Sequence, residues 1–329
     1  MQPSHALNKP RWFTVFVIFL AVILLYIAFR NVNWSELWRI IQSARLEYLA
    51  VACILSSANS LVRSLRWRVL LSAERKLGVL DVFWANMAGY LGNTFLPARA
   101  GEVVRSVALG RKARINVGFI LATALTERIM DAGVLVLIGS AALTTLHGAP
   151  LVLLNAGKAM AILSAGGIMM IIIFPMLESL FQKVLARLPL TPYWKNKANG
   201  LLEKLLLGMR SLHHTGRALK FLAFTAVIWL GDAIVALIIA HSVNLSFSFP
   251  QVFLLIVALG LSSAIPSTPG YIGVYQFVAV TVLQPFGFTI NQALAFILIF
   301  QAMAYILLTW WGLLGLWQLG SFRKQTDNN

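Results

Sequence analysis

Charged side chains are scarce in this chain of 329 residues. They make up 12% of the sequence, whereas hydrophobic residues make up 59% and the mean hydropathy is +0.79. Soluble domains carry roughly 25% charged residues, because their surface faces water. The chain has too few charges to cover a water-soluble globule of this size, so much of its surface must face lipid. This composition excludes a soluble enzyme, a fibrous protein and a disordered chain.

Residues that many catalytic sites need are also missing. Cys53 is the only cysteine in the sequence, which excludes an internal disulfide and a cysteine-based metal site. The aspartates never form the D-x-D or D-D-x-x-D pair that a metal-dependent sugar-nucleotide transferase needs for its cation. The sequence contains no G-x-x-x-x-G-K-[ST] loop and no H-E-x-x-H motif. We therefore expect no catalytic residue, no metal and no cofactor, and predict that the protein is not an enzyme.

Long apolar segments predict an all-α fold, a polytopic membrane helix bundle. About 20 apolar residues cross a bilayer as a helix. Six segments approach or exceed this length, at 12–29, 48–65, 117–145, 151–176, 219–243 and 291–318. We therefore predict six full crossings within a single integral membrane domain that covers residues 1–329.

Basic residues indicate the orientation of these crossings. The chain has 27 Lys and Arg against 11 Asp and Glu. Most of the basic residues lie in five clusters, at 9–11, 63–76, 99–114, 183–220 and 323–324. Lys and Arg concentrate in cytoplasmic loops. We therefore predict a bacterial-type inner membrane protein with both termini inside, and we attribute the positive charge to loops rather than to a nucleic-acid partner.

The candidate hairpins, about 80–110 and 251–285, contain two further apolar segments, 80–96 and 251–285, which are interrupted by proline and glycine. The first lies between two basic clusters and the second between two uncharged stretches, so both ends of each segment should lie on one side of the membrane. We interpret them as re-entrant hairpins that enter from opposite faces. Eight straight crossings are the alternative, which would place a basic stretch outside. Two amphipathic segments, about 34–47 and 195–218, predict interfacial helices.

The pattern P-x-x-x-G occurs twice, at 97–101 and at 266–270. Both copies follow an apolar run and open another helix, which suggests a weak internal inverted repeat. Broken helices at matching positions are typical of transporter binding sites. In the second copy, Thr268 or Ser267 is predicted as the helix N-cap, with Pro269 as the first helical residue.

The bends of both hairpins are predicted to bind a lipid head group. A helix N-terminus presents free N–H groups and a positive dipole end, which attract phosphate or carboxylate. The predicted head-group residues are Arg99, Gly101, Glu102, Arg105, Ser267, Thr268 and Gly270. The structural alternative is a pair of kinks packed among neighbouring helices, with Arg99 at the cytoplasmic surface.

The charges inside apolar segments include four that we single out, namely Glu127, Arg128, Asp131 and Asp232. Each costs roughly 2.5–3.5 kcal/mol at the centre of a membrane helix, so these side chains should face the bundle interior or a water-filled cavity. Arg128 and Asp232 fall at a similar depth, about 20 Å from the cytoplasmic side at ~1.5 Å per residue, and are predicted to pair. We interpret all four as gating or coupling charges. Ion pairs that simply hold helices together are the alternative.

Three motifs resemble those of one known family. Residues 92–105 (GNTFLPARAGEVVR) resemble the N-x-x-x-P-x-R-x-G-E-x-x-R signature of the lysylphosphatidylglycerol synthase transmembrane-domain family. Residues 126–131 (TERIMD) resemble its E-R-x-x-D motif, and 269–273 (PGYIG) its P-G-G-x-G motif. The motifs occur in the family's order and cover nearly the whole chain. Tyr271 replaces the usual second glycine, and Gln276 stands where members often carry glutamate.

The resemblance implies lipid handling. Members are described as flippase-like, and in those fused to an aminoacyl-lipid synthase this module moves the modified phospholipid between leaflets. The implied partners are membrane lipids and a separate lipid-modifying enzyme. Two alternatives remain open. One is a membrane-embedded lipid-modifying transferase with Glu102 or Glu127 as base, and the other is a non-transporting scaffold for a lipid-synthesis enzyme.

Overall fold

The computed structural model describes residues 11–96, 100–145, 151–173, 211–263 and 268–326, with short stretches between 180 and 209. Regular structure in these residues is helical, which confirms the all-α prediction. The helices are α1 (Arg11–Phe29), α2 (Trp34–Gln42), α3 (Leu46–Leu71), α4 (Val79–Phe95), α5 (Gly101–Ala113), α6 (Val117–Thr144), α7 (Leu151–Ile173), α10 (Thr215–Ser242), α11 (Phe249–Ser262), η3 (Pro269–Tyr271), α12 (Val274–Leu283), η4 (Gln284–Phe286) and α13 (Ile290–Thr326). Arg99, Ser267 and part of the predicted interfacial segment 195–218 lie outside the described residues.

Three helices in the described part of the chain are long and apolar enough to cross a membrane. They cover Leu46–Leu71, Thr215–Ser242 and Ile290–Gly320, with 26, 28 and 31 residues. At ~1.5 Å per residue each exceeds the ~30 Å thickness of a bilayer core. All three coincide with predicted crossings. The total of six crossings and the inside position of both termini stay predictions.

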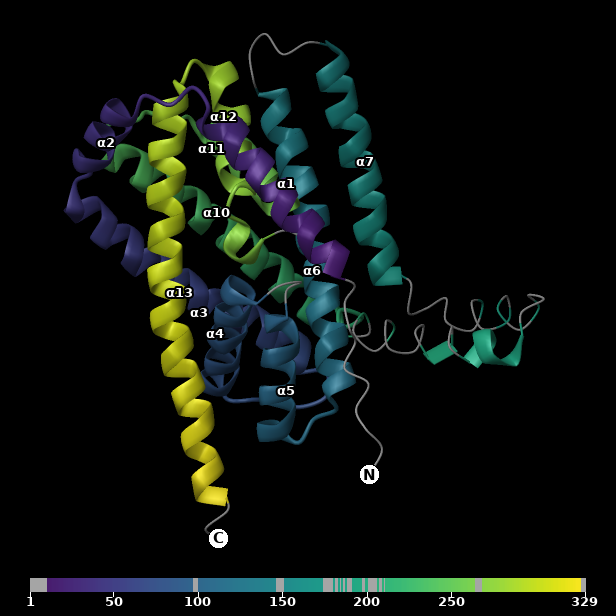
Figure 1. Cartoon of the computed structure of the whole chain (residues 1–329). Coiled ribbons are helices and arrows are strands. Elements are labelled where there is room, and N and C mark those ends of the chain that lie inside the picture. The colour runs from purple at the N-terminus through teal and green to yellow at the C-terminus, as the bar shows by residue number, and fades with distance from the viewer. Residues whose placement is uncertain are drawn as a thin grey trace.

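Both interrupted segments fold as pairs of short helices. Helix α4 packs on α5, and α11 packs on α12. In Figure 1 the α4–α5 pair lies in the lower half of the molecule and the α11–α12 pair in the upper half. The short helix η3, at the bend of the second pair, contacts α4 of the first pair. The two pairs therefore meet inside the bundle, while their placement in a membrane stays a prediction.

Glycines allow α4 and α5 to approach closely. A Cβ atom on Gly101 would lie 1.9 Å from the carbonyl oxygen of Gly89 and 2.5 Å from the backbone nitrogen of Asn93. A Cβ atom on Gly92 would lie 2.7 Å from the Cα atom of Gly101. Small residues at such crossings are typical of helix pairs in membranes, because they bring two backbones together. The structure thus gives Gly101, predicted as a head-group residue, a place in helix packing.

The Gly101→Ala variant tests this packing. Its new methyl group overlaps backbone atoms of α4, so we expect a loss of stability of about 3 kcal/mol or more, the upper end of overpacking costs. The apparent unfolding temperature of the detergent-purified protein would measure it. Gly166→Ala on α7 is the matched control, because nothing lies within 4 Å of its Cβ position. Equal unfolding temperatures for the two variants would contradict the close α4–α5 contact.

The bend of the second pair differs in detail from the predicted helix start. A helical turn does begin at Pro269 after Thr268, but it is only 3 residues long and has no side-chain cap. The Thr268 hydroxyl instead donates to the carbonyl of Ile272 at 2.7 Å. The longer helix α12 begins at Val274. The bend is therefore a tight turn rather than the start of a long helix.

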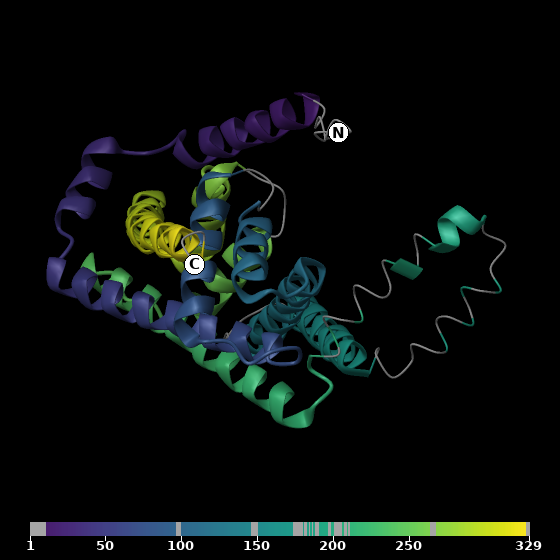
Figure 2. The same ribbon diagram turned by 90° about the horizontal axis from the view of Figure 1, so that it is seen from below.

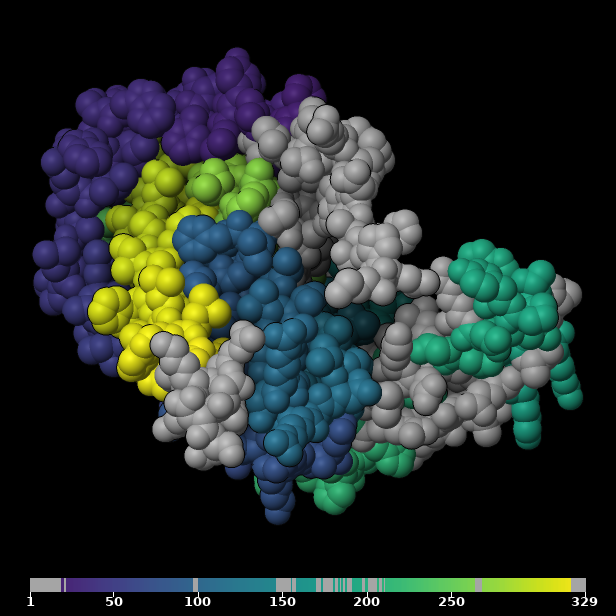
Figure 3. All heavy atoms as spheres, turned by 60° about the horizontal axis from the view of Figure 1, so that its bottom comes forward, coloured from purple at the N-terminus to yellow at the C-terminus, as the bar shows by residue number. Residues whose placement is uncertain are grey.

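Helix α13 packs against α2, α4 and α12. Figure 2 views it along its axis, with α2 and α3 on one side and α4 on another. On the face shown in Figure 3, α13 (yellow) lies beside the blue segment that contains α4 and α5. Helix α2 packs on α13 and buries Leu37. It ends at Gln42, so the predicted interfacial helix 34–47 is too long.

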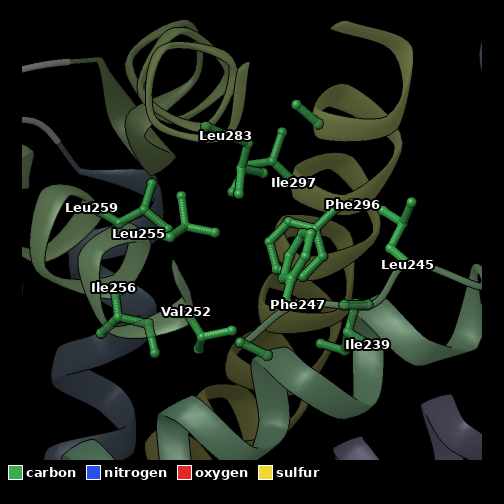
Figure 4. Close-up of a cluster of buried hydrophobic side chains, with 14 of the residues drawn as sticks. Ile239, Leu245, Phe247, Val252, Leu255, Ile256, Leu259, Leu283, Phe296 and Ile297 are labelled. Atoms are coloured by element: carbon green, nitrogen blue, oxygen red, sulfur yellow. The ribbon is translucent and has the colours of Figure 1, made fainter. Parts of the chain in front are cut away.

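The larger apolar cluster joins α10, α11, α12 and α13 (Figure 4). The rings of Phe247 and Phe296 meet edge to face with centroids 5.0 Å apart. Val252 and Leu255 of α11 and Leu283 of α12 belong to the same buried cluster. This packing holds the second helix pair against α13 and so fixes the position of its bend.

Candidate functional site

The charged side chains buried between α3, α5 and α6 form one continuous network of ion pairs. In order of contact its members are Asp131, Arg66, Glu127, Arg105, Glu102 and Arg128. Three acids and three arginines leave the network neutral. Charges at this depth are tolerated when they pair with each other inside the bundle.

Arg66 of α3 occupies one end of the network and is 1% exposed. Its Nη1 atom lies 2.5 Å from Asp131 Oδ1, and its Nη2 atom lies 2.8 Å from Glu127 Oε1. Nη1 also donates to the Thr225 hydroxyl of α10 at 3.2 Å. Arg66 therefore ties α3 to both α6 and α10. Glu127 and Asp131, predicted as gating or coupling charges, are both buried partners of Arg66 in this ion-pair network.

Arg105 of α5 forms the middle of the network and turns inward. Its Nη1 atom donates to Asn86 at 2.7 Å, while Nη2 lies 3.0 Å from Glu127 and 2.5 Å from Glu102. Its guanidinium stacks 4.3 Å from the ring centroid of Trp67. Both terminal nitrogens of this predicted head-group residue are thus engaged by protein groups.

Arg128 of α6 ends the network on its more open side. Its Nε and Nη2 atoms donate to the same oxygen of Glu102, at 3.0 and 2.6 Å. The Arg128 side chain is 31% exposed, whereas that of Glu102 is 16% exposed. Arg128 is therefore the member of the network with the most access to its surroundings.

Asp232 of α10 pairs with Arg63 of α3, so the predicted Arg128–Asp232 pair is wrong. Its Oδ1 atom also accepts a hydrogen bond from Asn59 Nδ2 at 2.6 Å. The reason is that α3 packs along α10 and presents Asn59 and Arg63, one turn apart, to the carboxylate. The estimated depth placed Arg128 and Asp232 at the same level of the membrane. It could not show that α3 packs along α10 and supplies the partner of Asp232.

Two cavities of about 250 and 330 Å³, each with charged and polar side chains in a largely apolar wall, lie beside these charges. The first is also lined by the serine-rich face of α3, and the second by the end of α4 and by the bend at Gly270 and Tyr271. The residues that line both cavities are Arg63, Tyr90, Arg128, Asp232, Phe300, Ala304 and Leu308. The two cavities therefore share a charged boundary, and we treat them as one compartment, the polar compartment.

Buried amides fix the bend against α13. The carbonyl of Gly270 accepts hydrogen bonds from Gln301 Nε2, at 2.6 Å, and from the Tyr305 hydroxyl. Gln276 Nε2 donates to Gln301 Oε1 at 2.6 Å, and Gln276 Oε1 accepts from Gly273 N at 2.8 Å. Gly270 has a φ of 68°, and a Cβ atom there would lie 2.2 Å from the Tyr305 oxygen. Only glycine fits this position, which explains the glycine of the motif.

The structure separates the predicted site residues into groups. Arg128, Asp232 and Gly270 line the polar compartment. Glu102, Arg105, Glu127 and Asp131 belong to the ion-pair network. In the described part of the chain, no group of three or more His, Cys, Asp and Glu side chains is placed to hold a metal ion.

Arg63, Arg66, Asn59 and Tyr90 are site residues that the sequence reasoning missed. Arg63 and Arg66 were counted with the basic cluster 63–76, although both lie within the helix Leu46–Leu71. The sequence contained one signal for them. The apolar segment that begins at residue 48 can extend into a longer helix only if Arg63 and Arg66 are part of that helix. Two buried acids on one face of 117–145 also required more than one arginine as a partner.

Helices long enough to cross a membrane, a neutral ion-pair network and a polar compartment define an all-α membrane protein with an internal polar site. Residues 12–312 match the family described as the lysylphosphatidylglycerol synthase TM region, and the chain belongs to this family. Membership connects the protein with membrane lipids. A search of curated proteins found no match.

Proposed function

We propose that the protein is a lipid translocase that moves a phospholipid or a related lipid between membrane leaflets. The head group passes through the polar compartment, and the acyl chains stay in the surrounding lipid. The protein works in a bacterial-type inner membrane, with membrane lipids and a separate lipid-modifying enzyme as partners. It is not an enzyme in this proposal and has no nucleic-acid partner.

The observation that carries the proposal is the charged boundary shared by both cavities. Arg63, Arg128 and Asp232 line a cavity inside a membrane helix bundle, where charges are costly and by default functional. Arg66 and Glu127 are sealed at 1% and 2% exposure, whereas Arg63 and Arg128 retain 19% and 31%. The cavities therefore present positive donors that helix packing alone does not need.

The position of the bends supports the same conclusion. The end of α4, at Asn93 and Thr94, and the bend at Gly270 both border the larger cavity. Interrupted helices that meet at a polar cavity are the usual architecture of transporter binding sites. The summed volume of the two cavities lies in the range of roughly 300–1,000 Å³ that small-molecule sites occupy.

Transport of fluorescent phospholipids in liposomes tests the proposal. Purified protein should make lipids of the inner leaflet accessible to a membrane-impermeant quencher faster than protein-free liposomes do. We expect Arg128→Gln to slow this transfer roughly 10-fold or more, because a hydrogen bond to a charged group contributes about 1.5–3 kcal/mol.

Lys158→Gln is the matched control, because Lys158 is exposed on α7 and lies outside both cavity walls. Wild-type protein that moves no phospholipid above the protein-free rate contradicts the translocase. Mass spectrometry of the same lipids covers the transferase alternative, since a modified lipid made by the purified protein would establish an enzyme instead.

A further inference from the structure

We propose that Arg63 and Arg128 form a binding site for one phosphate-type anion, and that the Asp232 carboxylate occupies Arg63 while the site is empty. The site rests on the proposed function for its purpose, the passage of a phospholipid head group. Binding of the anion can nevertheless be measured without any transport of lipid.

Arg63 and Arg128 bring two guanidinium groups to the walls of the polar compartment. Among the described wall residues, Arg63 and Arg128 are the arginines that line both cavities. They come from different helices, α3 and α6, and both keep partial exposure. A guanidinium is a planar fork of donors that suits phosphate oxygens, and it stays charged at any physiological pH. Two forks on one cavity boundary are a suitable receptor for a phosphate or phosphodiester.

The Asp232 carboxylate can release Arg63 without losing all its partners. One carboxylate oxygen contacts Arg63 and the other accepts from Asn59 at 2.6 Å. Asn59 is itself anchored through the carbonyl of Ile228 at 3.1 Å. The Arg63 and Asp232 side chains keep 19% and 25% exposure and both line the two cavities, so a ligand in the compartment can reach the pair. Asp232 stays hydrogen-bonded to Asn59 after the exchange.

Arg128 has an equivalent arrangement at the other side of the boundary. It uses two nitrogens on one oxygen of Glu102, and the second oxygen of that carboxylate lies 2.5 Å from Arg105. If Arg128 turns toward a ligand, Glu102 keeps Arg105. When these arginines turn toward a ligand, Glu102 therefore keeps a cationic partner in Arg105 and Asp232 keeps a hydrogen-bond donor in Asn59.

Charge balance gives the sign of the expected effects. The ion-pair network is neutral and the Arg63–Asp232 pair is neutral, so the empty compartment holds no excess positive charge in these groups. An anion must compete with Asp232 for Arg63. Removing the carboxylate removes the competitor and adds one positive charge at the boundary. Asp232→Asn should therefore bind a phosphate-type anion more tightly than the wild type.

Binding to the detergent-purified full chain tests the site. The probe for a lipid source is short-chain fluorescent phosphatidylglycerol, and the probe for a free anion is inorganic phosphate. We expect Asp232→Asn to lower the Kd for one of these probes about 10-fold. The probe whose Kd falls shows whether the anion is a lipid head group or a free phosphate. Adding Arg63→Gln to Asp232→Asn should weaken binding of that probe again by about 10-fold, because the released guanidinium is then missing.

Glu74→Gln is the matched control, since it adds the same positive charge at an exposed position after α3 and should leave both Kd values unchanged. A fluorescent diacylglycerol with the same chains should show no difference between Asp232→Asn and the wild type. Unchanged or weaker binding of both probes by correctly folded Asp232→Asn overturns the site, as does an equal gain in Glu74→Gln. Should Asp232→Asn fail to fold, Arg63→Gln alone must weaken binding, and wild-type affinity there overturns the site.

The outcomes separate the site from the translocase. Protein that shows the Asp232→Asn shift but moves no phospholipid retains the anion site and refutes the translocase. Protein that moves phospholipid without the shift refutes the anion site alone.

Discussion

Replacing Arg66 by methionine is expected to destabilise the protein by about 3–5 kcal/mol, the usual cost of removing one partner from a buried ion pair. Arg66 is 1% exposed and serves both Asp131 and Glu127. Methionine fills similar volume but leaves the Asp131 carboxylate without a cation. The apparent unfolding temperature should fall by roughly 10 °C, on the scale of about 2–4 °C per kcal/mol that applies to globular domains of about 150–250 residues.

Two variants show whether charge rather than shape is responsible. Arg39→Met makes the same substitution at an exposed position of α2 and should leave the unfolding temperature nearly unchanged. Arg66→Met combined with Asp131→Leu should recover much of the loss, because replacing both partners of a buried pair is often close to neutral. Glu127 keeps Arg105 in that double variant. If Arg66→Met unfolds at the same temperature as Arg39→Met, the ion pairs of Arg66 do not stabilise the packing of α3 against α6 and α10.

Arg66 also shows what the sequence reasoning could and could not provide. Hydropathy and the cost of charge in lipid predicted that Glu127, Asp131 and Asp232 face the bundle interior or a water-filled cavity, and the structure places them there. They did not provide the partners, because depth along the membrane normal is one coordinate and contact requires three. The positive-inside argument then removed Arg63 and Arg66 from consideration by assigning them to a loop.

The fold itself followed from local patterns where those patterns are strong. The apolar segment 219–243 became Thr215–Ser242, since a long apolar run has no other stable form in lipid. The weaker amphipathic pattern of 34–47 was extended too far, because the chain turns after Gln42 although similar residues continue. Gly101 was read as a ligand-facing residue. A glycine needed for close backbone approach looks the same in sequence, and only the partner helix distinguishes the two roles.

Gln276→Glu is expected to make the stability of the protein depend on pH. The Gln276 side chain acts in both directions, since Oε1 accepts from Gly273 N while Nε2 donates to Gln301 Oε1 at 2.6 Å. An ionised carboxylate at this position has no proton for Gln301 and would face an oxygen. Gln301 cannot simply rotate its amide, because its Nε2 atom holds the carbonyl of Gly270. The introduced carboxyl therefore fits the folded protein only in its protonated form.

The sign of the pH effect follows from this preference. The unfolded chain ionises the introduced carboxyl near pH ~4.3, whereas the folded chain retains the proton, so stability is complete below that pH and falls as pH rises. At ~1.36 kcal/mol per pH unit the loss reaches up to about 4 kcal/mol at pH 7. Unfolding temperatures of the variant and the wild type at pH 5 and pH 7 measure it.

Gln292→Glu supplies the control for this change. The Gln292 side chain accepts a hydrogen bond from Thr289 N at 2.9 Å through Oε1, and a carboxylate can replace that acceptor. The same amide-to-carboxyl substitution is thus compatible with ionisation at position 292 and incompatible with it at position 276. If both variants lose the same stability between pH 5 and pH 7, the amide at 276 is not required as a donor. A larger loss for Gln276→Glu means that the Gln276 amide holds the bend at Gly270 independently of pH. A glutamate at this position would make the stability of the bend depend on pH.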